Sequence, residues 1–336
     1  QGSSWHGTHV AGTVAAVTNN GEGVAGVAYG AKVVPVRVLG KCGGLTSDIA
    51  DGIIWASGGN VSGTSANANP ADVINMSLGG AGACSSTTQN AINTARNNGT
   101  VVVIAAGNDN DNSANYNPGN CNGVVNVASV GRNGGRAYYS NYGSNIDVAA
   151  PGGAQSFAND SEGVLSTYNS GSTTPSSDSY GFSQGTSMAA PHVAGAFALL
   201  KSAKPNASIF DIENALKESG IRVTTSNWNW ETPRLNLLSA FNLLDNGDII
   251  TGTTLLSVFG PSNNKAESFI RIYNSSNIRG SVSGIIIDDS IGEAVSTFNL
   301  EIPSNASKQF SFEEIVLLAS PQFETNNNPN QLYTLH

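Results

Sequence analysis

Ser187 is the residue of this 336-residue chain whose type and position most directly suggest covalent chemistry. It lies in GTSMAAPHVAGAFALL (185–200), where a glycine precedes it closely and a long apolar run with helical spacing follows it. A serine at the start of a helix is often only an N-cap, whose hydroxyl accepts a backbone N–H. Alternatively, its own backbone N–H points at an atom that becomes negatively charged, because the helix dipole favours an anion there. Ser187 alone does not decide between the two interpretations.

Two other polar residues stand at comparable positions. His6 begins HGTHVAGTVAAV (6–17), a run of small residues with helical spacing. His9 follows three residues later, but the absence of an HExxH pattern and of a nearby third ligand argues against a metal site. Asn108 follows the apolar run VVVIAAG, so its amide can reach over a sheet edge and donate to an oxyanion. Each residue also has an ordinary interpretation, as a buried histidine and as a turn asparagine.

Alternating strand-like and helix-like patterns must position these residues. Four β-branched runs predict strands: AKVVPVRVL (31–39), DVINMSL (72–78), TVVVIAAG (100–107) and GVVNVASV (123–130). Between them, TSDIADGIIWASG and STTQNAINTARNNG have helical spacing and end in glycine. Near-continuous apolar strands separated by helices predict an α/β fold with a doubly wound, mostly parallel sheet. Ligands of such sheets bind beyond the carboxyl ends of the strands.

The pattern changes in the last quarter of the chain. Short strand-like runs separated by Asn, Ser, Gly and Pro predict a smaller antiparallel β-sandwich at 249–336, after a first domain at 1–244 and a linker at 245–248. The charges support this division, since 1–244 carry 14 acidic and 11 basic side chains whereas 245–336 carry 10 and 4. Because the chain lacks a starting Met and ends in a strand-like run, we expect a fragment at both ends, with the C-terminal domain incomplete.

Composition argues against two classes of partner. The formal net charge is −9, which disfavours nucleic acid. No run of about 18 apolar residues is present, so the sequence predicts no membrane span.

Taken together, four motifs resemble those of the subtilisin-like serine proteases: HGTHVAGTVAAV, VINMSLGG, VVVIAAGN and GTSMAAPHVAGA. They occur in that family's order, and TPRLNLLSAFN resembles its closing helix, so the resemblance runs from residue 6 to residue 244. It implies that Ser187 is the nucleophile and His6 the general base of an endopeptidase. Asn108 would be the oxyanion donor, together with the Ser187 backbone N–H. His9 and His192 are then structural.

The resemblance also implies a catalytic Asp that precedes the histidine in the chain. Only five residues precede His6 and none is acidic, while Asp48, Asp51 and Asp72 lie downstream and match no such motif. We therefore expect the catalytic Asp upstream of Gln1. The alternative is an inactive homologue that acts as a binding or adhesion protein through the C-terminal β module.

A substrate cleft follows from the same resemblance. SLGG (77–80) is similar to the family's cleft strand, where backbone groups of Ser77, Leu78 and Gly79 would pair with an extended peptide. Without the other motifs, SLGG would be an ordinary strand end.

Two further residues are expected at the cleft. Gly107 ends the strand before Asn108, and NDNDNSANYNP (108–118) is similar to the proteinase K branch, where a Tyr borders the S1 pocket. Tyr116 is the candidate for that wall. No acidic residue is evident in the pocket, which predicts broad specificity for apolar or aromatic P1 residues.

A structural Ca²⁺ is implied at Asp147. This residue, in SNIDVAAPGG, matches a Ca²⁺-binding Asp of proteinase K, and the carried-over carbonyl ligands are those of Asn122 and Val124. One carboxylate with carbonyls and waters suits Ca²⁺, which takes about 6–8 oxygens. The alternative is that Asp147 accepts backbone N–H groups in a turn.

The three cysteines are Cys42, Cys84 and Cys121. Cys42 and Cys84 each follow a predicted strand, and consecutive parallel strands joined by a helix usually neighbour one another. The sequence therefore favours a Cys42–Cys84 disulfide over free thiols, in an oxidising compartment, and leaves Cys121 without an evident partner. The resemblance implies a secreted bacterial-type enzyme, expected to be monomeric, with polypeptide substrates and its own propeptide as partners.

Overall fold

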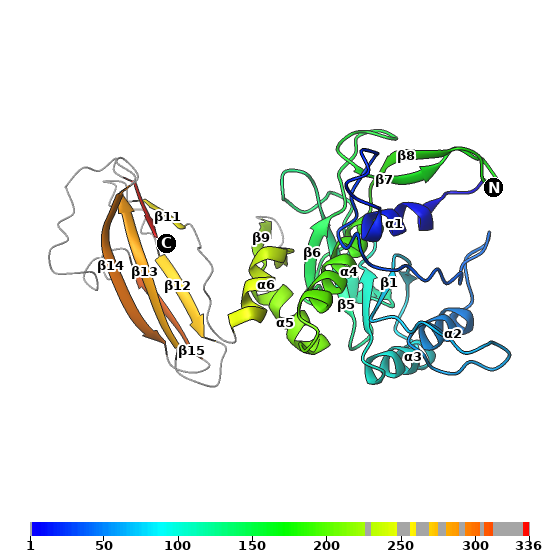
Figure 1. Cartoon of the computed structure of the whole chain (residues 1–336), viewed down its shortest axis with the longest axis horizontal. Helices are drawn as coiled ribbons and strands as arrows, with labels where there is room; N and C mark the ends of the chain where they lie inside the picture. Colours follow the sequence, from blue (N-terminus) through cyan, green and yellow to red (C-terminus); the bar gives the residue numbers. More distant parts are fainter. Residues whose placement is uncertain are drawn as a thin grey trace. The chain divides into compact units, whose positions relative to one another are not determined.

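The computed structural model describes residues 2–225, 230–246 and the C-terminal strands β11 to β16. The chain separates into two compact units, Gln1–Leu244 and Asp245–His336 (Figure 1). Helix α6 (Leu237–Asn246) continues into the first two positions of the predicted linker.

A six-stranded sheet in the order β1-β3-β5-β6-β10-β9 forms the centre of the first unit. Its strands are β1 (Val73–Met76), β3 (Val101–Ala105), β5 (Val125–Val130), β6 (Val148–Pro151), β10 (Trp230–Arg234) and β9 (Ile221–Thr225). The first five pair in parallel, and only β9 pairs antiparallel, with β10. The predicted, mostly parallel sheet is confirmed.

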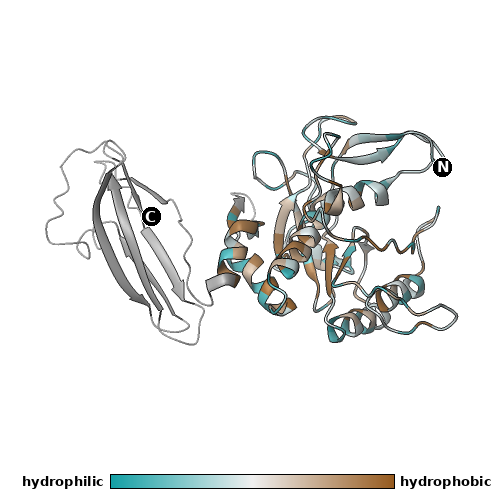
Figure 2. Ribbon diagram, in the orientation of Figure 1, coloured by the Kyte–Doolittle hydropathy of each residue, from teal (hydrophilic) through white to brown (hydrophobic). Residues whose placement is uncertain are grey.

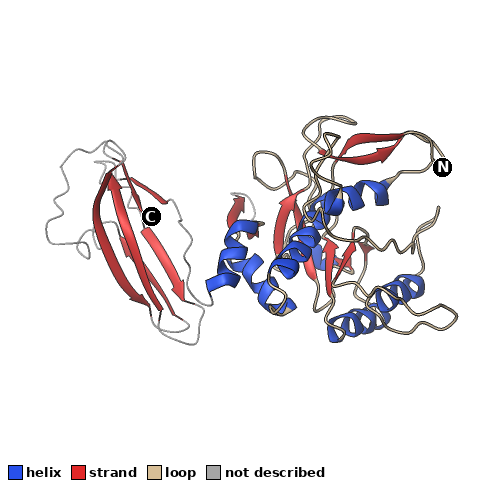
Figure 3. Cartoon of the chain, in the orientation of Figure 1, coloured by secondary structure: helices blue, strands red, loops and turns tan. Residues whose placement is uncertain are grey.

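Strand β3 shows how the sheet divides the core, because successive side chains of a strand point to opposite faces. Val101 and Val103 pack in one cluster with helices α4 (Thr186–Ala203) and α5 (Ile209–Glu218). Val102 and Ile104 pack on the other face. The helices of that face are α2 (Thr46–Ala56) and α3 (Ser86–Asn97). All four valine and isoleucine side chains have 0% exposure, which explains why this run is apolar without alternation. Figure 2 shows the hydrophobic colouring on these central strands, and Figure 3 the helices around them.

The run 31–39 forms no strand in the structure, so that prediction is wrong. Val33 and Leu39 are 49% and 41% exposed, and Val36 is 38% exposed. A β-branched run favours extended backbone but cannot form a strand without a partner to bond. The parallel order of the sheet therefore begins at β1.

Helix α1 (His6–Ala15) packs against α4 and against the hairpin of β7 (Val164–Asn169) and β8 (Asp178–Ser183). A Cβ at Gly12 would lie 2.5 Å from the Ser166 hydroxyl, so the small residue lets the helix approach the hairpin closely.

A small two-stranded ribbon is formed by β2 and β4, outside the central sheet. Strand β2 (Gly80–Ala81) pairs antiparallel with β4 (Tyr116–Asn117), just after the 3₁₀ turn Ser113–Asn115.

Six strands of the second unit are described. They are β11 (Leu256–Phe259), β12 (Phe269–Asn274), β13 (Gly280–Asp288), β14 (Glu293–Ile302), β15 (Ala306–Ser311) and β16 (Leu332–Leu335). All described pairings are antiparallel, in a four-stranded order β11-β16-β13-β14 and a pair β12-β15. No described helix is long and apolar enough to cross a membrane.

Candidate active site

Ser187 is the second residue of α4, directly beyond the sheet edge where β1 and β3 end. Gly185 precedes the helix with φ +146°, a conformation that L side chains rarely adopt. A Cβ there would lie 3.6 Å from the Ser187 nitrogen and 3.7 Å from Asn108 Nδ2. Asn108 Oδ1 is also 3.7 Å away, so the Ser187 nitrogen and the Asn108 amide lie beside the same glycine.

The Asn108 amide is oriented by Thr186. Its Oδ1 accepts from the Thr186 N–H at 2.8 Å and from the Thr186 hydroxyl at 2.9 Å. The same hydroxyl accepts from the Gly107 N–H at 3.2 Å. Because both bonds use the amide oxygen, Nδ2 is left to donate toward a ligand.

Asn141 holds the loop that carries Asn108. Its side chain is 0% exposed, and its Oδ1 accepts from the N–H groups of Asp109 at 2.9 Å and Asp111 at 3.1 Å. Its Nδ2 donates to the Ala106 carbonyl at 3.0 Å. Gly107, at φ +105°, passes so close that a Cβ would lie 2.2 Å from this amide. We call Asn108, Asn141, Thr186 and Ser187 the oxyanion half of the site.

The hydroxyl of Ser187 donates to the Ser77 carbonyl at 3.4 Å, and the Ser77 hydroxyl donates to the Ser187 carbonyl at 2.7 Å. Ser77 follows β1, so these bonds join the end of that strand to the start of α4. The structure thus brings together Ser187, Asn108 and Ser77.

His6 is the first residue of α1 and is half-buried. Burial lowers the pKa of its imidazole, and the nearby ring of His9 lowers it further. The neutral ring is the form that can accept a proton. Within the described residues, no hydrogen bond joins the ring of His6 to Ser187 or to any carboxylate.

Helix α1 itself is well anchored. His9 is 0% exposed, and its Nε2 donates to the Val164 carbonyl at 3.0 Å and the Gly181 carbonyl at 3.1 Å. The Ser166 hydroxyl donates to the His9 carbonyl at 2.7 Å. We call α1, β7 and β8 the histidine half of the site. His9 is structural in this arrangement, as is His192, whose Nδ1 donates to the Met188 carbonyl at 2.8 Å.

The predicted substrate residues lie around the β2–β4 ribbon. Gly79 is exposed and follows Leu78, whose side chain packs toward the α2–α3 core. Tyr116 pairs with Ala81, and a Cβ on Gly107 would lie 3.5 Å from its ring. The predicted wall residue is therefore next to the oxyanion loop.

Two acidic side chains lie near Tyr116. Its hydroxyl donates to Asp111 Oδ2 at 3.4 Å. Burial raises the pKa of Tyr116, and the charges of Asp109 and Asp111 raise it further. The two aspartates lie one and three residues after Asn108, so this loop brings negative charge close to Tyr116.

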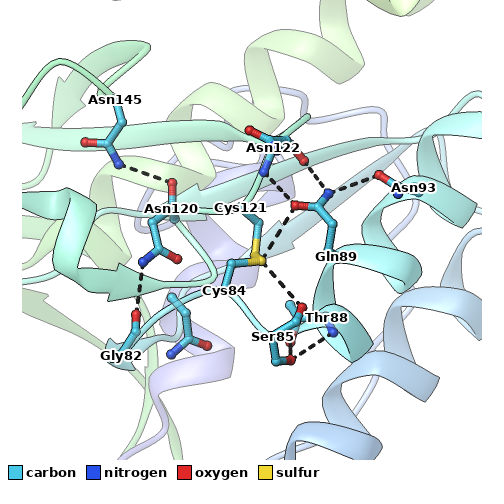
Figure 4. Close-up of a disulfide and its surroundings, with 12 residues drawn as sticks. Gly82, Cys84, Ser85, Thr88, Gln89, Asn93, Asn120, Cys121, Asn122 and Asn145 are labelled. Carbon is cyan, nitrogen blue, oxygen red and sulfur yellow. Dashed lines mark hydrogen bonds between the residues drawn. A yellow bond between two sulfur atoms is a disulfide. The ribbon is translucent and has the colours of Figure 1, made fainter.

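The cysteine pairing was predicted wrongly. Cys84 bonds to Cys121, with 5.2 Å between their Cα atoms, and Cys42 is free and exposed (Figure 4). The prediction assumed that the run before Cys42 is a strand beside β1, and in the structure it joins no sheet. The actual disulfide links the segments that follow β2 and β4 and so fastens the ribbon.

The predicted calcium ligands do not fit Ca²⁺ as they stand. Asp147 Oδ1 lies 2.8 Å from the ammonium of Lys217, and its Oδ2 accepts from the Asn126 N–H at 2.8 Å. The Asn122 carbonyl accepts from Gln89 Nε2 at 3.0 Å. The described residues contain no group of three or more His, Cys, Asp or Glu side chains able to hold a metal ion.

Sequence reasoning missed Thr186 and Asn141. Thr186 could have been suspected from its place beside Ser187, inside the same motif. Asn141 gives no such signal, because it acts on backbone atoms about thirty residues earlier in the chain.

Comparison with known proteins agrees with this geometry. The profile of the subtilase family matches residues 1–238. The chain is similar to an extracellular protease of Xanthomonas campestris pv. campestris, with 64% identity over 61% of this chain and 34% of that protein. It is also similar to an extracellular basic protease of Dichelobacter nodosus, with 42% identity over 93% of this chain and 52% of that protein. The chain thus spans about a third to a half of these relatives.

Among solved structures, it is similar to one of proteases from Pseudoalteromonas arctica PAMC 21717. The two share 81% identity with a TM-score of 0.71, over 73% of this chain and 72% of the other. A cold-adapted subtilisin-like serine proteinase matches at 31% identity and a TM-score of 0.53, over 70% of this chain and 74% of the other. From its motifs, its sheet and these relatives, the chain belongs to the subtilase family.

Proposed function

We propose that the protein is a serine endopeptidase that hydrolyses peptide bonds through an acyl-enzyme on Ser187. The observation that carries the proposal is that the Ser187 N–H and the Asn108 amide lie beside the same glycine, Gly185, while Thr186 engages the amide oxygen and leaves Nδ2 to donate. An arrangement of this kind stabilises the oxyanion of a tetrahedral intermediate without reorganising during the reaction.

In this mechanism, neutral His6 removes the proton from the Ser187 hydroxyl as that oxygen attacks the scissile carbonyl. The carbonyl oxygen becomes negative between Asn108 Nδ2 and the Ser187 N–H. Protonated His6 then gives its proton to the leaving amine, and water releases the acyl group by the same steps in reverse order.

His6 needs an orienting acceptor for this work, because a neutral imidazole has two tautomers. The resemblance supplies one, the Asp expected upstream of Gln1. We propose that this carboxylate accepts from Nδ1 of His6, which leaves Nε2 free to accept the Ser187 proton.

We propose an extended polypeptide as substrate, paired with the backbone of Ser77, Leu78 and Gly79. Tyr116 would form one wall of the S1 pocket, next to Gly107. The carboxylates of Asp109 and Asp111 beside that wall favour a pocket that also accepts basic P1 side chains, in addition to the apolar and aromatic ones predicted from the sequence.

Several wider features belong to the same proposal. The two relatives from Xanthomonas and Dichelobacter are named extracellular proteases, and a disulfide suits an oxidising compartment, so we propose secretion. A propeptide partner, a monomeric state and a β-sandwich at 249–336 are expectations carried from the sequence. Calcium held by Asp147, Asn122 and Val124 is not part of this proposal, because the ammonium of Lys217 lies 2.8 Å from that carboxylate.

The experiment is peptide hydrolysis by the protein with its complete encoded sequence, compared with Ser187→Ala. We expect hydrolysis to be abolished in the variant and a fluorophosphonate adduct to map to Ser187 in the parent. Undiminished hydrolysis by Ser187→Ala would overturn the proposal. Loss of the upstream Asp from the gene would favour the inactive binding protein, which no comparison supports.

A further inference from the structure

Four charged side chains meet behind the active site, where α3 and α5 approach β6. Asp147 directly precedes β6, Glu213 and Lys217 lie one turn apart on α5, and Arg96 lies in the last turn of α3. We call Arg96, Asp147, Glu213 and Lys217 the charge cluster. It contains two cations and two anions, so its formal charge is balanced.

The ammonium of Lys217 is the centre of this cluster. Its Nζ lies 2.8 Å from Asp147 Oδ1 and 2.8 Å from Glu213 Oε1. Arg96 Nη2 lies 3.0 Å from the other oxygen of Glu213. The side chains are 11–32% exposed, so water screens these contacts only partly.

The ion pairs of the cluster are partly buried, so the loss of one partner is costly. Burial raises the pKa of Asp147, while the charge of Lys217 and the N–H of Asn126 oppose that rise. Burial also lowers the pKa of Lys217, but the two carboxylates more than offset it, so the net pKa is raised. Removing one partner of such a pair leaves an uncompensated buried charge.

One of the two carbonyl groups expected to bind calcium, that of Asn122, is engaged by the chain itself. Gln89 bridges Asn122 from both sides, since its Nε2 donates to the Asn122 carbonyl and its Oε1 accepts the Asn122 N–H at 2.9 Å. A Ca²⁺ ion at Asp147 would have to displace an ammonium held by two carboxylates, or lie beside it against charge repulsion.

We propose that the ammonium of Lys217 is the resident cation at Asp147, in the place where the resemblance puts Ca²⁺. The protein therefore holds no calcium at Asp147, and this part of the fold is stable without the ion. Removing the ammonium leaves the carboxylates of Asp147 and Glu213 without the cation between them, with Arg96 on the other oxygen of Glu213, and carboxylate oxygens are ligands that Ca²⁺ prefers. Lys217→Met removes the resident cation, so the stability of this variant should depend on calcium.

The experiment measures thermal unfolding of the chain after chelation, with and without added CaCl₂. Every variant also carries Ser187→Ala, so that self-digestion cannot shift the midpoint. We expect Lys217→Met to be destabilised and to regain about 5–10 °C at calcium about a hundredfold above its Kd. This extra gain should be absent from Lys217→Arg, from Lys217→Met/Asp147→Asn and from the exposed control Lys32→Ala.

A second measurement does not depend on the folding of Lys217→Met. Calorimetric titration of CaCl₂ into the parent and into Asp147→Asn should give the same number of bound ions. One ion fewer in Asp147→Asn would overturn the proposal, as would a calcium response of Lys217→Met equal to that of the parent.

Discussion

The two halves of the active site are built to different degrees in the described chain. In the oxyanion half, the polar side chains that set the geometry are paired: Thr186 holds Asn108, and buried Asn141 holds the loop. In the histidine half, α1 is anchored through His9 and Ser166, but the imidazole of His6 has no hydrogen-bonding partner among the described residues. The described residues therefore hold the proposed oxyanion donor in place, whereas they do not orient the imidazole of the proposed base.

The largest expected effect is on the oxyanion half. Asn108→Ala removes one of two donors, and for the corresponding asparagine of subtilisin the loss in kcat is about 10²–10³-fold. We expect a loss of that size with little change in KM, measured by peptide hydrolysis with the complete encoded protein. A rise in KM with kcat unchanged would mean that Asn108 only binds substrate.

The disulfide fastens the ribbon beside the oxyanion half, and its loss should cost stability. Cys84→Ser should lower the free energy of unfolding by about 2–4 kcal/mol, measured by denaturant unfolding. Cys42→Ser is the matched control and should have little effect, because that thiol is free and exposed. An equal loss in Cys42→Ser and no loss in Cys121→Ser would restore the pairing expected from the sequence.

Asn141→Ala should loosen the loop that carries Asn108 and reduce kcat by about tenfold, the equivalent of one to two hydrogen bonds. In the Asn108→Ala background it should reduce kcat no further, because the group that it positions is gone. Asn126→Ala is the control, since Asn126 is also 0% exposed and its amide donates to Ser113 and Asn145 instead. It should lower stability and leave kcat unchanged, and equal kcat losses in both variants would contradict the positioning role.

Three histidines, two of them in the histidine half and one on α4, should make stability depend on pH. The folded protein lowers the pKa of His6, His9 and His192, mainly by burial. The unfolded chain, with histidine pKa values of about 6.5, then binds more protons in mildly acidic solution. The free energy of unfolding should be constant above about pH 7 and should decrease as the pH falls through about 6.5. Urea unfolding between pH 8 and pH 5 measures this, and His6→Gln should weaken the dependence; a flat profile would contradict it.

The smallest effect is expected at the anchor of α1. Ser166→Ala removes the bond to the His9 carbonyl and should cost about 1 kcal/mol, or about 2–4 °C in Tm. The exposed Ser161→Ala serves as the control. No change in Tm would show that the hairpin does not hold the histidine half.

Much of this arrangement was predictable from the sequence. The parallel strands β1, β3 and β5 follow from apolar runs, and the choice of Ser187 and Asn108 follows from the resemblance of their motifs. The conformation of the run 31–39 could not be predicted in this way. Its residue types favour extended backbone, but they do not supply a strand partner. The Cys42 pairing failed for the same reason.

The tertiary hydrogen bonds and ion pairs also could not be predicted from the sequence. Asn141 acts on the loop after β3, and Lys217 reaches Asp147 from a helix seventy positions later in the chain. Neither pair has a characteristic spacing, because the fold alone brings the partners together.

The difference between the oxyanion half and the histidine half is tested most directly by the rate at which a fluorophosphonate labels the chain 1–336. Peptide mass spectrometry then identifies the labelled residue. We expect the adduct on Ser187, slowed further by Asn108→Ala, but formed about 10⁴-fold more slowly than in a subtilase with a complete triad. Labelling as fast as in the complete enzyme would contradict the account, because a carboxylate of this chain would then have to orient His6.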